Sequence, residues 1–173
     1  MDSETRSMFE RNPINLFRAL ANNPGVMKQW FDFGEWIRWE GKVDARLREL
    51  AILQVGSSAK SPYEFSHHVV IGRRFGVSDE DLEGLKLLAS GTTPSHFSAL
   101  ELAVLTAARD LTERGEIDDP LWAELAASLD TESLLELVVV IGFYAMVVRV
   151  LAAVELDVEP DFLPAVDYLP VQP

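Results

Sequence analysis

The residues best suited to chemistry lie in one short stretch, Ser61 to His68, which reads SPYEFSHH. Two of the three histidines in the chain are adjacent there. Glu64 and His68 are four residues apart, so on a helix they share a face and can touch. A carboxylate beside an imidazole orients the ring, fixes its tautomer and raises its pKa, as in many general acids and bases. The spacing therefore predicts a proton-transfer site, with His68 and Glu64 as catalytic residues.

The same stretch also has a purely structural interpretation. Ser61, Pro62 and then Glu64 form the pattern of a capping box at the start of a helix. This pattern leaves His68 unexplained, although an isolated Glu–His pair on a helix is often surface decoration. His67 points about 100° away from His68, and periodicity does not decide which of the two faces inward. From these residues alone, a helix cap and a catalytic site both stay open.

Other kinds of site fit the sequence poorly. The chain has no cysteine, which excludes disulfides, thiolate nucleophiles and cysteine-ligated metals together. Glu64, His68 and one upstream carboxylate could form a metal set, but no second helix offers a Glu-x-x-His partner. Ser61 lies in no G-x-S-x-G elbow, and no glycine-rich phosphate loop occurs. We therefore expect no metal and no cofactor.

Five aromatic residues crowd the segment from Trp30 to Trp39. Such a cluster usually belongs to a core or an interface. Trp30 and Phe33 lie on one helical face, so they could also form the wall of an apolar pocket. On that interpretation the candidate substrate-binding residues are Trp30, Phe33, Ser61 and His67.

The elements that must position these residues are all helical. Asn, Asp and Ser residues followed by proline or by acidic residues mark helix starts, and glycines mark ends. Helices are predicted after Asn12-Pro13, Asn23-Pro24, Asp44, Ser61-Pro62, Ser78, the link GTTPS and Asp119-Pro120, and from about Glu132. We expect one all-α domain over 1–173, a bundle of about seven to eight helices. Residues 12–42 would be an N-terminal helical extension, and 160–173 an extended, proline-rich tail.

Composition limits the partners. Asp and Glu number 28 against 15 Lys and Arg, and the net charge of −13 disfavours nucleic acid and anionic membrane surfaces. The N-terminus has no apolar signal region. The most apolar run, 137–148, is shorter than the about 20 residues that cross a bilayer. We expect a cytoplasmic protein, and the apolar final helix and the tryptophan cluster favour a homo-oligomer.

The order of these motifs resembles the carboxymuconolactone decarboxylase superfamily, which includes the alkylhydroperoxidase AhpD. The family signature is a glutamate in an R-x-x-E-L helix, then C-x-x-C at the next helix start, then a histidine four residues after the second cysteine. In this chain RLREL supplies Glu49, Ser61 and Glu64 stand at the cysteine positions, and His68 is the histidine. The segments ARDL, DDPLW and ELVVVIGFY match a cysteine-less branch, so the resemblance covers roughly residues 12–160.

The resemblance implies an all-α, usually oligomeric protein with Glu49, Ser61, Glu64 and His68 lining a buried pocket. The peroxidase branch works through its two cysteines, which this chain lacks, so thiol peroxidase chemistry would contradict its composition. The decarboxylase branch uses an acid–base histidine. We therefore expect a cofactor-independent lyase, decarboxylase or isomerase that acts on a small organic acid or lactone. His68, Glu64 and Glu49 would be catalytic, and Tyr63 would donate to a developing oxyanion.

The alternative hypothesis is a non-enzymatic small-molecule-binding or interaction protein that keeps the pocket. The discriminating observation is whether Glu49, Glu64 and His68 meet beside a cavity with room for a ligand.

Overall fold

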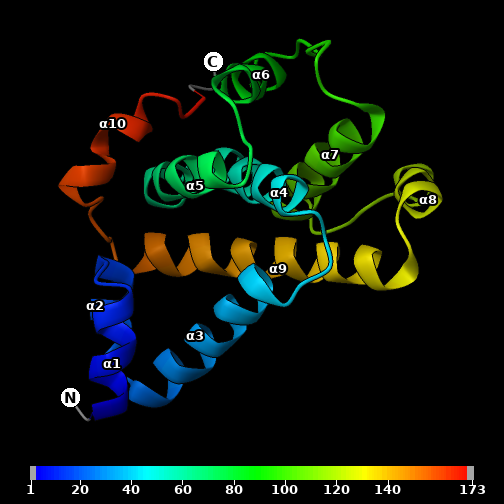
Figure 1. The fold of residues 1–173 in the computed structure, drawn as a ribbon. Helices are drawn as coiled ribbons and strands as arrows, with labels where there is room; N and C mark the ends of the chain where they lie inside the picture. Colours follow the sequence, from blue (N-terminus) through cyan, green and yellow to red (C-terminus); the bar gives the residue numbers. More distant parts are fainter. Residues whose placement is uncertain (1–2, 171–173) are drawn as a thin grey trace.

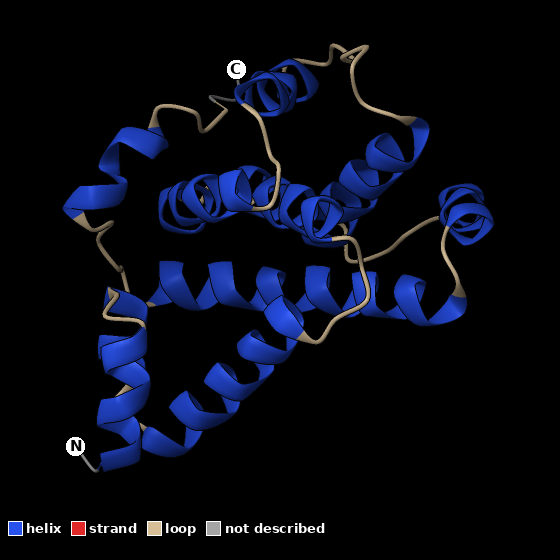
Figure 2. Ribbon diagram, in the orientation of Figure 1, coloured by secondary structure: helices blue, strands red, loops and turns tan. Residues whose placement is uncertain are grey.

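The computed structural model describes residues 3–170, and this part of the chain contains helices and no strands (Figures 1 and 2). In chain order the elements are α1 (Ser3–Arg11), α2 (Asn15–Leu20), α3 (Pro24–Trp39), α4 (Ala45–Ser58), α5 (Pro62–Arg74), α6 (Asp79–Ala89), α7 (Ala99–Glu113), α8 (Asp119–Ser128), α9 (Thr131–Ala153), the 3₁₀ turn η1 (Pro160–Phe162) and α10 (Leu163–Val166). The predicted all-α fold is confirmed.

Side-chain caps explain why most helices begin where the sequence predicts. The side chains of Asn23, Asp44 and Ser61 each accept a hydrogen bond from a backbone N–H in the first turn of α3, α4 and α5. Ser78 and Ser98 form complete capping boxes at α6 and α7. Each cap satisfies donors that the helix itself leaves unpaired.

The two ends of the chain differ from the prediction. Helix α1 was not predicted, and α2 begins at Asn15, two residues later than the Asn12-Pro13 signal indicates. The tail is not extended over its described part, because η1 and α10 form there. A proline is tolerated in the first turn of a helix, and α10 gains burial by packing Ala165 against α5. Residues 171–173 of the predicted tail lie outside the described residues.

Helix α4 lies at the centre and packs against α5, α7 and α9 (Figure 1). Every side chain from Leu47 to Ser57 is buried. The crossing with α5 is close because position 56 is glycine: a Cβ there would lie 3.2 Å from the backbone nitrogen of Phe65. As a result, any polar side chain on α4 between these residues must find its partners inside the protein.

Helix α9 is the long apolar helix of the bundle. By length and composition α9 could cross a membrane, so the short length of the apolar run at 137–148 does not by itself exclude a membrane span. However, 56% of its most apolar window is buried inside the protein, as in a core helix. It packs on α4, α7 and α8, and it leaves Leu135, Val139 and Met146 exposed.

Helices α1, α2 and α3 pack together around Met8, Phe17, Met27 and Phe31. They stand apart from the rest of the bundle in Figure 1 and meet it mainly through Leu16, Ile37 and Trp30. Trp30 contacts Phe143 of α9 edge-on, with ring centroids 5.6 Å apart. The space between these helices, α5 and α9 contains the candidate site.

Candidate active site

His68 lies between two carboxylates. Its Nδ1 is 2.7 Å from Glu49 Oε2, and its Nε2 is 3.0 Å from Glu64 Oε1. The side chains of Glu49, Glu64 and His68 are only 2%, 5% and 6% exposed. Since both ring nitrogens face acceptors, the ring that satisfies them is the imidazolium, with a proton on each nitrogen. Burial lowers the pKa of His68, but Glu49 and Glu64 outweigh it and raise the pKa to about 9.

Two helices position this group. Glu49 comes from the centre of α4, whereas Glu64 and His68 are one turn apart on α5. Position 72 is glycine, and a Cβ there would lie 3.0 Å from Val77 Cγ2 and 3.5 Å from the Cβ of Glu49. This small residue lets α5 approach α4 closely enough for His68 to reach Glu49.

Arg48 supports Glu49 from the side away from His68. Its Nε and Nη2 both lie 3.2 Å from Glu49 Oε1, to which they donate, and its Nη1 donates to the backbone carbonyl of Ile37. Burial raises the pKa of Glu49, but His68 and Arg48 together lower it by more, so the net shift of the pKa is downward. Arg48 therefore compensates the charge of Glu49, and Glu64 is the carboxylate that faces the imidazolium from the other side.

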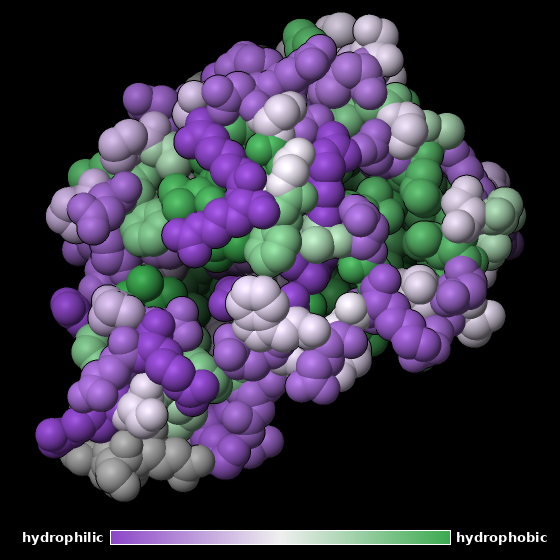
Figure 3. Space-filling view, in the orientation of Figure 1, coloured by the Kyte–Doolittle hydropathy of each residue, from purple (hydrophilic) through white to green (hydrophobic). Residues whose placement is uncertain are grey.

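A pocket of about 480 Å³ opens beside His68. It lies between α5, α9 and the N-terminal helices, where Figure 3 shows a hollow with apolar walls and hydrophilic side chains at its rim. The lining from α5 and its C-cap residue Phe75 forms two adjacent rows: Tyr63, His67, Val70 and Arg74 in one, and Glu64, His68, Ile71 and Phe75 in the other. Both histidines therefore line the pocket, from neighbouring rows. Glu49 does not line it and lies behind His68.

Tyr144 of α9 is a site residue that the sequence analysis missed. Its ring meets that of His68 edge-on, with centroids 5.0 Å apart, and it lines the pocket. Among the described residues its hydroxyl has no hydrogen-bond partner, which leaves it available to a ligand. Burial raises the pKa of Tyr144, so the hydroxyl keeps its proton and can donate. The available signal was a lone tyrosine in the aliphatic run ELVVVIGFY.

Tyr63 lies on the same pocket but is already engaged. Its hydroxyl donates to Glu159 Oε1 at 2.9 Å and accepts from the backbone N–H of Leu16 at 3.1 Å. Burial raises the pKa of Tyr63 well above its usual range. Because both roles of the hydroxyl are taken, Tyr144 is better placed than Tyr63 to donate to a ligand.

His67 is held differently from His68. Its ring stacks between Tyr63 and Phe162, with centroid distances of 4.2 and 3.7 Å. Its Nδ1 donates to the Tyr63 carbonyl at 2.8 Å. Burial lowers the pKa of His67, so the neutral ring presents a lone pair at Nε2. That atom lies 3.0 Å from Glu159 Oε2, yet neither atom has a hydrogen bond within the described part of the chain.

Of the other predicted substrate-binding residues, Trp30, Phe33 and Ser61, only one lines the pocket beside His68. Trp30 lines the pocket, whereas Phe33 does not: it stacks on Trp36 and meets Phe143 edge-on. Ser61 faces a second, smaller cavity of about 330 Å³. It caps α5 by accepting from the Glu64 N–H, but the reciprocal bond of the expected capping box is absent because the Glu64 carboxylate turns to His68.

The geometry suits proton transfer better than metal binding. Glu49 and Glu64 occupy opposite nitrogens of one imidazole, whereas metal ligands must converge on one point. Among the residues that the structure describes, no three His, Asp or Glu side chains are placed to hold a metal ion.

The chain is an all-α protein with a buried Glu49–His68–Glu64 group between α4 and α5. Residues 24–110 match the description "Carboxymuconolactone decarboxylase family", and the chain belongs to that family. A search of curated protein sequences found no match.

Solved structures share the fold at low sequence identity. A complex of a cysteine-to-alanine variant of the debrominase Bmp8 with 2,3,4-tribromopyrrole is 19% identical, with a TM-score of 0.75 over 87% of this chain and 79% of that one. The alkylhydroperoxidase AhpD core of a peroxidase-related protein from Ralstonia eutropha JMP134 is 14% identical, with a TM-score of 0.74 over 92% and 85%. A peroxidase-related protein from Silicibacter sp. TM1040 is 18% identical, with a TM-score of 0.72 over 92% and 84%. At these identities the likeness concerns the fold alone.

Proposed function

We propose that the protein is a cofactor-independent acid–base enzyme, a lyase (decarboxylase) or isomerase, that acts on a small organic acid or lactone. The observation that carries the proposal is the position of His68, held between Glu49 and Glu64 at the wall of a cavity. A pKa of about 9 keeps this ring charged at neutral pH, so the resting site is an acid with a carboxylate beside it. This sharpens the expectation from sequence, which left open whether His68 is the acid or the base.

Each residue has a separate part in such a reaction. In a decarboxylation the C–C bond to the carboxyl group breaks, CO₂ leaves, and the electron pair moves into an enolate whose oxygen accepts a hydrogen bond from Tyr144. The proton shared by His68 and Glu64 then passes to the carbanionic carbon. In an isomerisation the Glu64 carboxylate would first take a proton from a carbon next to the carbonyl, and the electron pair of that C–H bond would form the enolate. Glu49 and Arg48 hold the imidazole in place throughout.

The alternative, a binding protein with a relic pocket, is less well supported. It would be favoured if core side chains filled the space beside His68. Instead a cavity of about 480 Å³ adjoins the ring, within the range of small-molecule sites. Thiol peroxidase activity is excluded by composition, because the chain has no cysteine.

We also propose that the enzyme is cytoplasmic and forms a homo-oligomer. Apolar side chains that the single chain leaves exposed support association: Trp39 is 66% exposed and Leu135 is 62% exposed.

The direct test is hydrogen exchange at carbon. A panel of lactones and keto acids would be incubated in D₂O and followed by ¹H NMR, both for loss of C–H signal and for decarboxylation. We expect turnover of at least one compound by the wild type and a loss of about 100-fold or more in His68→Gln. Turnover that survives this substitution in a folded protein would overturn the mechanism.

A further inference from the structure

Arg74 is the last residue of α5 and closes one of its two pocket-lining rows. It is exposed, and it has no hydrogen bond, ion pair or ring contact with any described residue. Its neighbour Arg73 is also exposed, but it pairs with Asp79 at 2.6 Å, lies over the ring of Tyr168 and does not line the pocket. Of these two arginines, only Arg74 is free to bind something in the pocket.

The charge of the pocket lining is opposite to that of the chain. Arg11, Arg38 and Arg74 line the pocket against Glu35 and Glu64, and His68 adds a further positive charge, whereas the whole chain carries −13. Two of these arginines have contacts: Arg38 lies 3.6 Å from Glu35, and Arg11 sits over the ring of Phe31. A positive pocket in an acidic protein attracts anions, and Arg74 is the lining arginine left without a contact.

Between Arg74 and His68 on α5 lies the apolar Ile71, and the pocket lining also includes the apolar side chains of Trp30, Phe143 and Val147 from α3 and α9. The two residues are six positions apart, or about 9 Å along the helix axis at 1.5 Å per residue. Both side chains tilt toward the helix N-terminus, so this separation is largely kept. An anion bound at Arg74 is therefore held apart from the proton-transfer pair by an apolar spacer.

We propose that the pocket takes a carboxylate with a planar, apolar body of one or two rings, whose anionic group is held by Arg74 while the reacting carbon lies at His68 and Glu64. This assignment rests on the proposed function, which it narrows from small organic acids in general to those with an apolar spacer. Arg74 is the specificity-determining residue, because it selects the charge without contacting the reacting atoms.

Binding of a matched pair of probes tests the proposal. Naphthalene-2-carboxylate and its neutral counterpart naphthalene-2-carboxamide would be titrated into the wild type and variants by isothermal calorimetry. We expect the wild type to prefer the carboxylate, Arg74→Gln to weaken it about tenfold with little effect on the amide, and Arg74→Lys to restore part of the loss. Arg73→Gln makes the same change in net charge outside the pocket and should bind both probes as the wild type does.

The outcomes separate this proposal from the proposed function. Equal losses in Arg73→Gln and Arg74→Gln would show a non-specific charge effect and overturn it, as would a wild type that binds neither probe or shows no preference for the carboxylate. If carboxylate binding depends on Arg74 but no carbon acid is turned over, the acid–base function fails and the Arg74 assignment stands. If His68→Gln abolishes turnover while Arg74→Gln leaves carboxylate binding unchanged, the acid–base function stands and the Arg74 assignment fails.

Discussion

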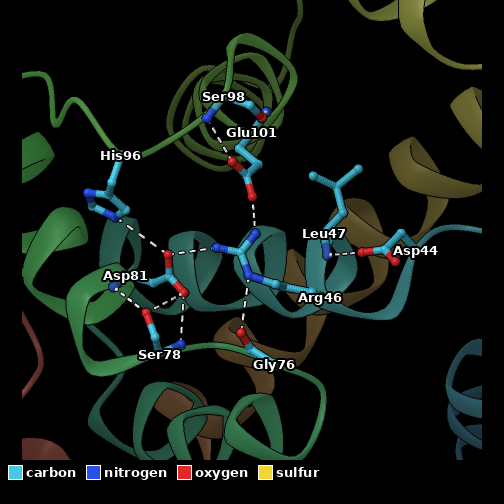
Figure 4. A network of polar contacts seen from close by, with 9 residues as sticks. All are labelled: Asp44, Arg46, Leu47, Gly76, Ser78, Asp81, His96, Ser98 and Glu101. Atoms are coloured by element: carbon cyan, nitrogen blue, oxygen red, sulfur yellow. Dashed lines mark hydrogen bonds and ion pairs between the residues drawn. The ribbon is translucent and has the colours of Figure 1, made fainter.

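Helix α4 carries two ionic clusters with nearly the same composition. One joins Arg46 to Asp81, Glu101 and His96 (Figure 4), and the other joins Arg48 and Glu49 to His68 and Glu64. Each contains an arginine, a histidine and two carboxylates. Composition alone would not show which of them is a site.

The difference lies in which residue is central and what surrounds it. In the first cluster Arg46 is central: Nη2 donates to Asp81 Oδ1 at 2.7 Å, Nη1 pairs with Glu101, and Nε donates to the Gly76 carbonyl (Figure 4). Asp81 and Glu101 also complete the capping boxes of α6 and α7. Arginine does not release its proton in proteins, so this cluster ties three helices together.

In the second cluster a histidine is central, and it adjoins the pocket. An imidazole can release and regain a proton near neutral pH, and its two carboxylates set the pKa at which it does so. A buried ionic cluster is therefore a candidate site when its central group can titrate and a cavity adjoins it. The first three predictions below test that distinction.

The largest expected effect is on stability, from removal of the two arginines. Arg48→Met leaves Glu49 buried with one partner fewer, and we expect a loss of about 3–5 kcal/mol in the free energy of unfolding. Arg46→Met should cost about 1–2 kcal/mol, because the Arg46 side chain is 31% exposed and solvent screens what remains. Urea unfolding followed by circular dichroism measures both. Equal losses would mean that Arg46 and Arg48 contribute equally to the free energy of unfolding, although only Arg48 is fully buried.

The pH dependence of stability should report His68. Its pKa rises from 6.5 to about 9 on folding, so its charge stabilises the folded state fully below pH 6.5. This contribution is lost as the pH rises toward 9, up to about 3 kcal/mol in total at about 1.4 kcal/mol per unit. Urea midpoints from pH 6 to 9.5 should therefore fall for the wild type and for His96→Gln. The same slope in His68→Gln would show that another group is responsible.

Tyr144→Phe separates catalysis from stability. The hydroxyl has no partner within the described chain, so its removal should change the free energy of unfolding by less than about 0.5 kcal/mol. If it stabilises an oxyanion, turnover should fall roughly 100-fold, or about 3 kcal/mol in the barrier. Carbon–hydrogen exchange and urea unfolding on the same preparation measure the two effects. A large loss of stability with unchanged turnover would make Tyr144 a packing residue.

Local patterns predicted much of this molecule. The caps at Asn23, Asp44 and Ser61 located helix starts because their hydrogen bonds lie within one turn. The link between Glu64 and His68 followed from i,i+4 spacing, and Glu49 was placed through the family resemblance.

What the sequence did not reveal depends on distant contacts. Glu159 meets Tyr63 across 96 positions from a tail predicted to be extended. Tyr144 lies in an aliphatic run that indicates only a buried helix, and Arg74 is one of the basic residues that commonly occur in the last turn of a helix. Only the packing of α5 against α9 and the N-terminal helices gives these residues their roles, and no short window of sequence contains that packing.

The smallest expected effect concerns a carboxylate–histidine contact outside the two clusters, between Glu159 and His67. Burial raises the pKa of Glu159, but hydrogen bonds from the Asn15 N–H and the Tyr63 hydroxyl outweigh this and lower it. The carboxylate is therefore ionised at neutral pH, and its Oε2 faces the lone pair of a neutral His67 at 3.0 Å. Two acceptors at this distance repel.

Glu159→Gln should remove that repulsion. The glutamine oxygen can still accept from Asn15 and Tyr63, and its amide can donate to His67 Nε2. We expect Glu159→Gln to be neutral or slightly stabilising at pH 7, whereas Glu159→Ala, which leaves the Tyr63 hydroxyl without an acceptor for its proton, should cost about 1–2 kcal/mol. Urea unfolding at pH 7 compares them. If both variants lose the same stability, the negative charge itself is needed at this position, and His67 is protonated like His68.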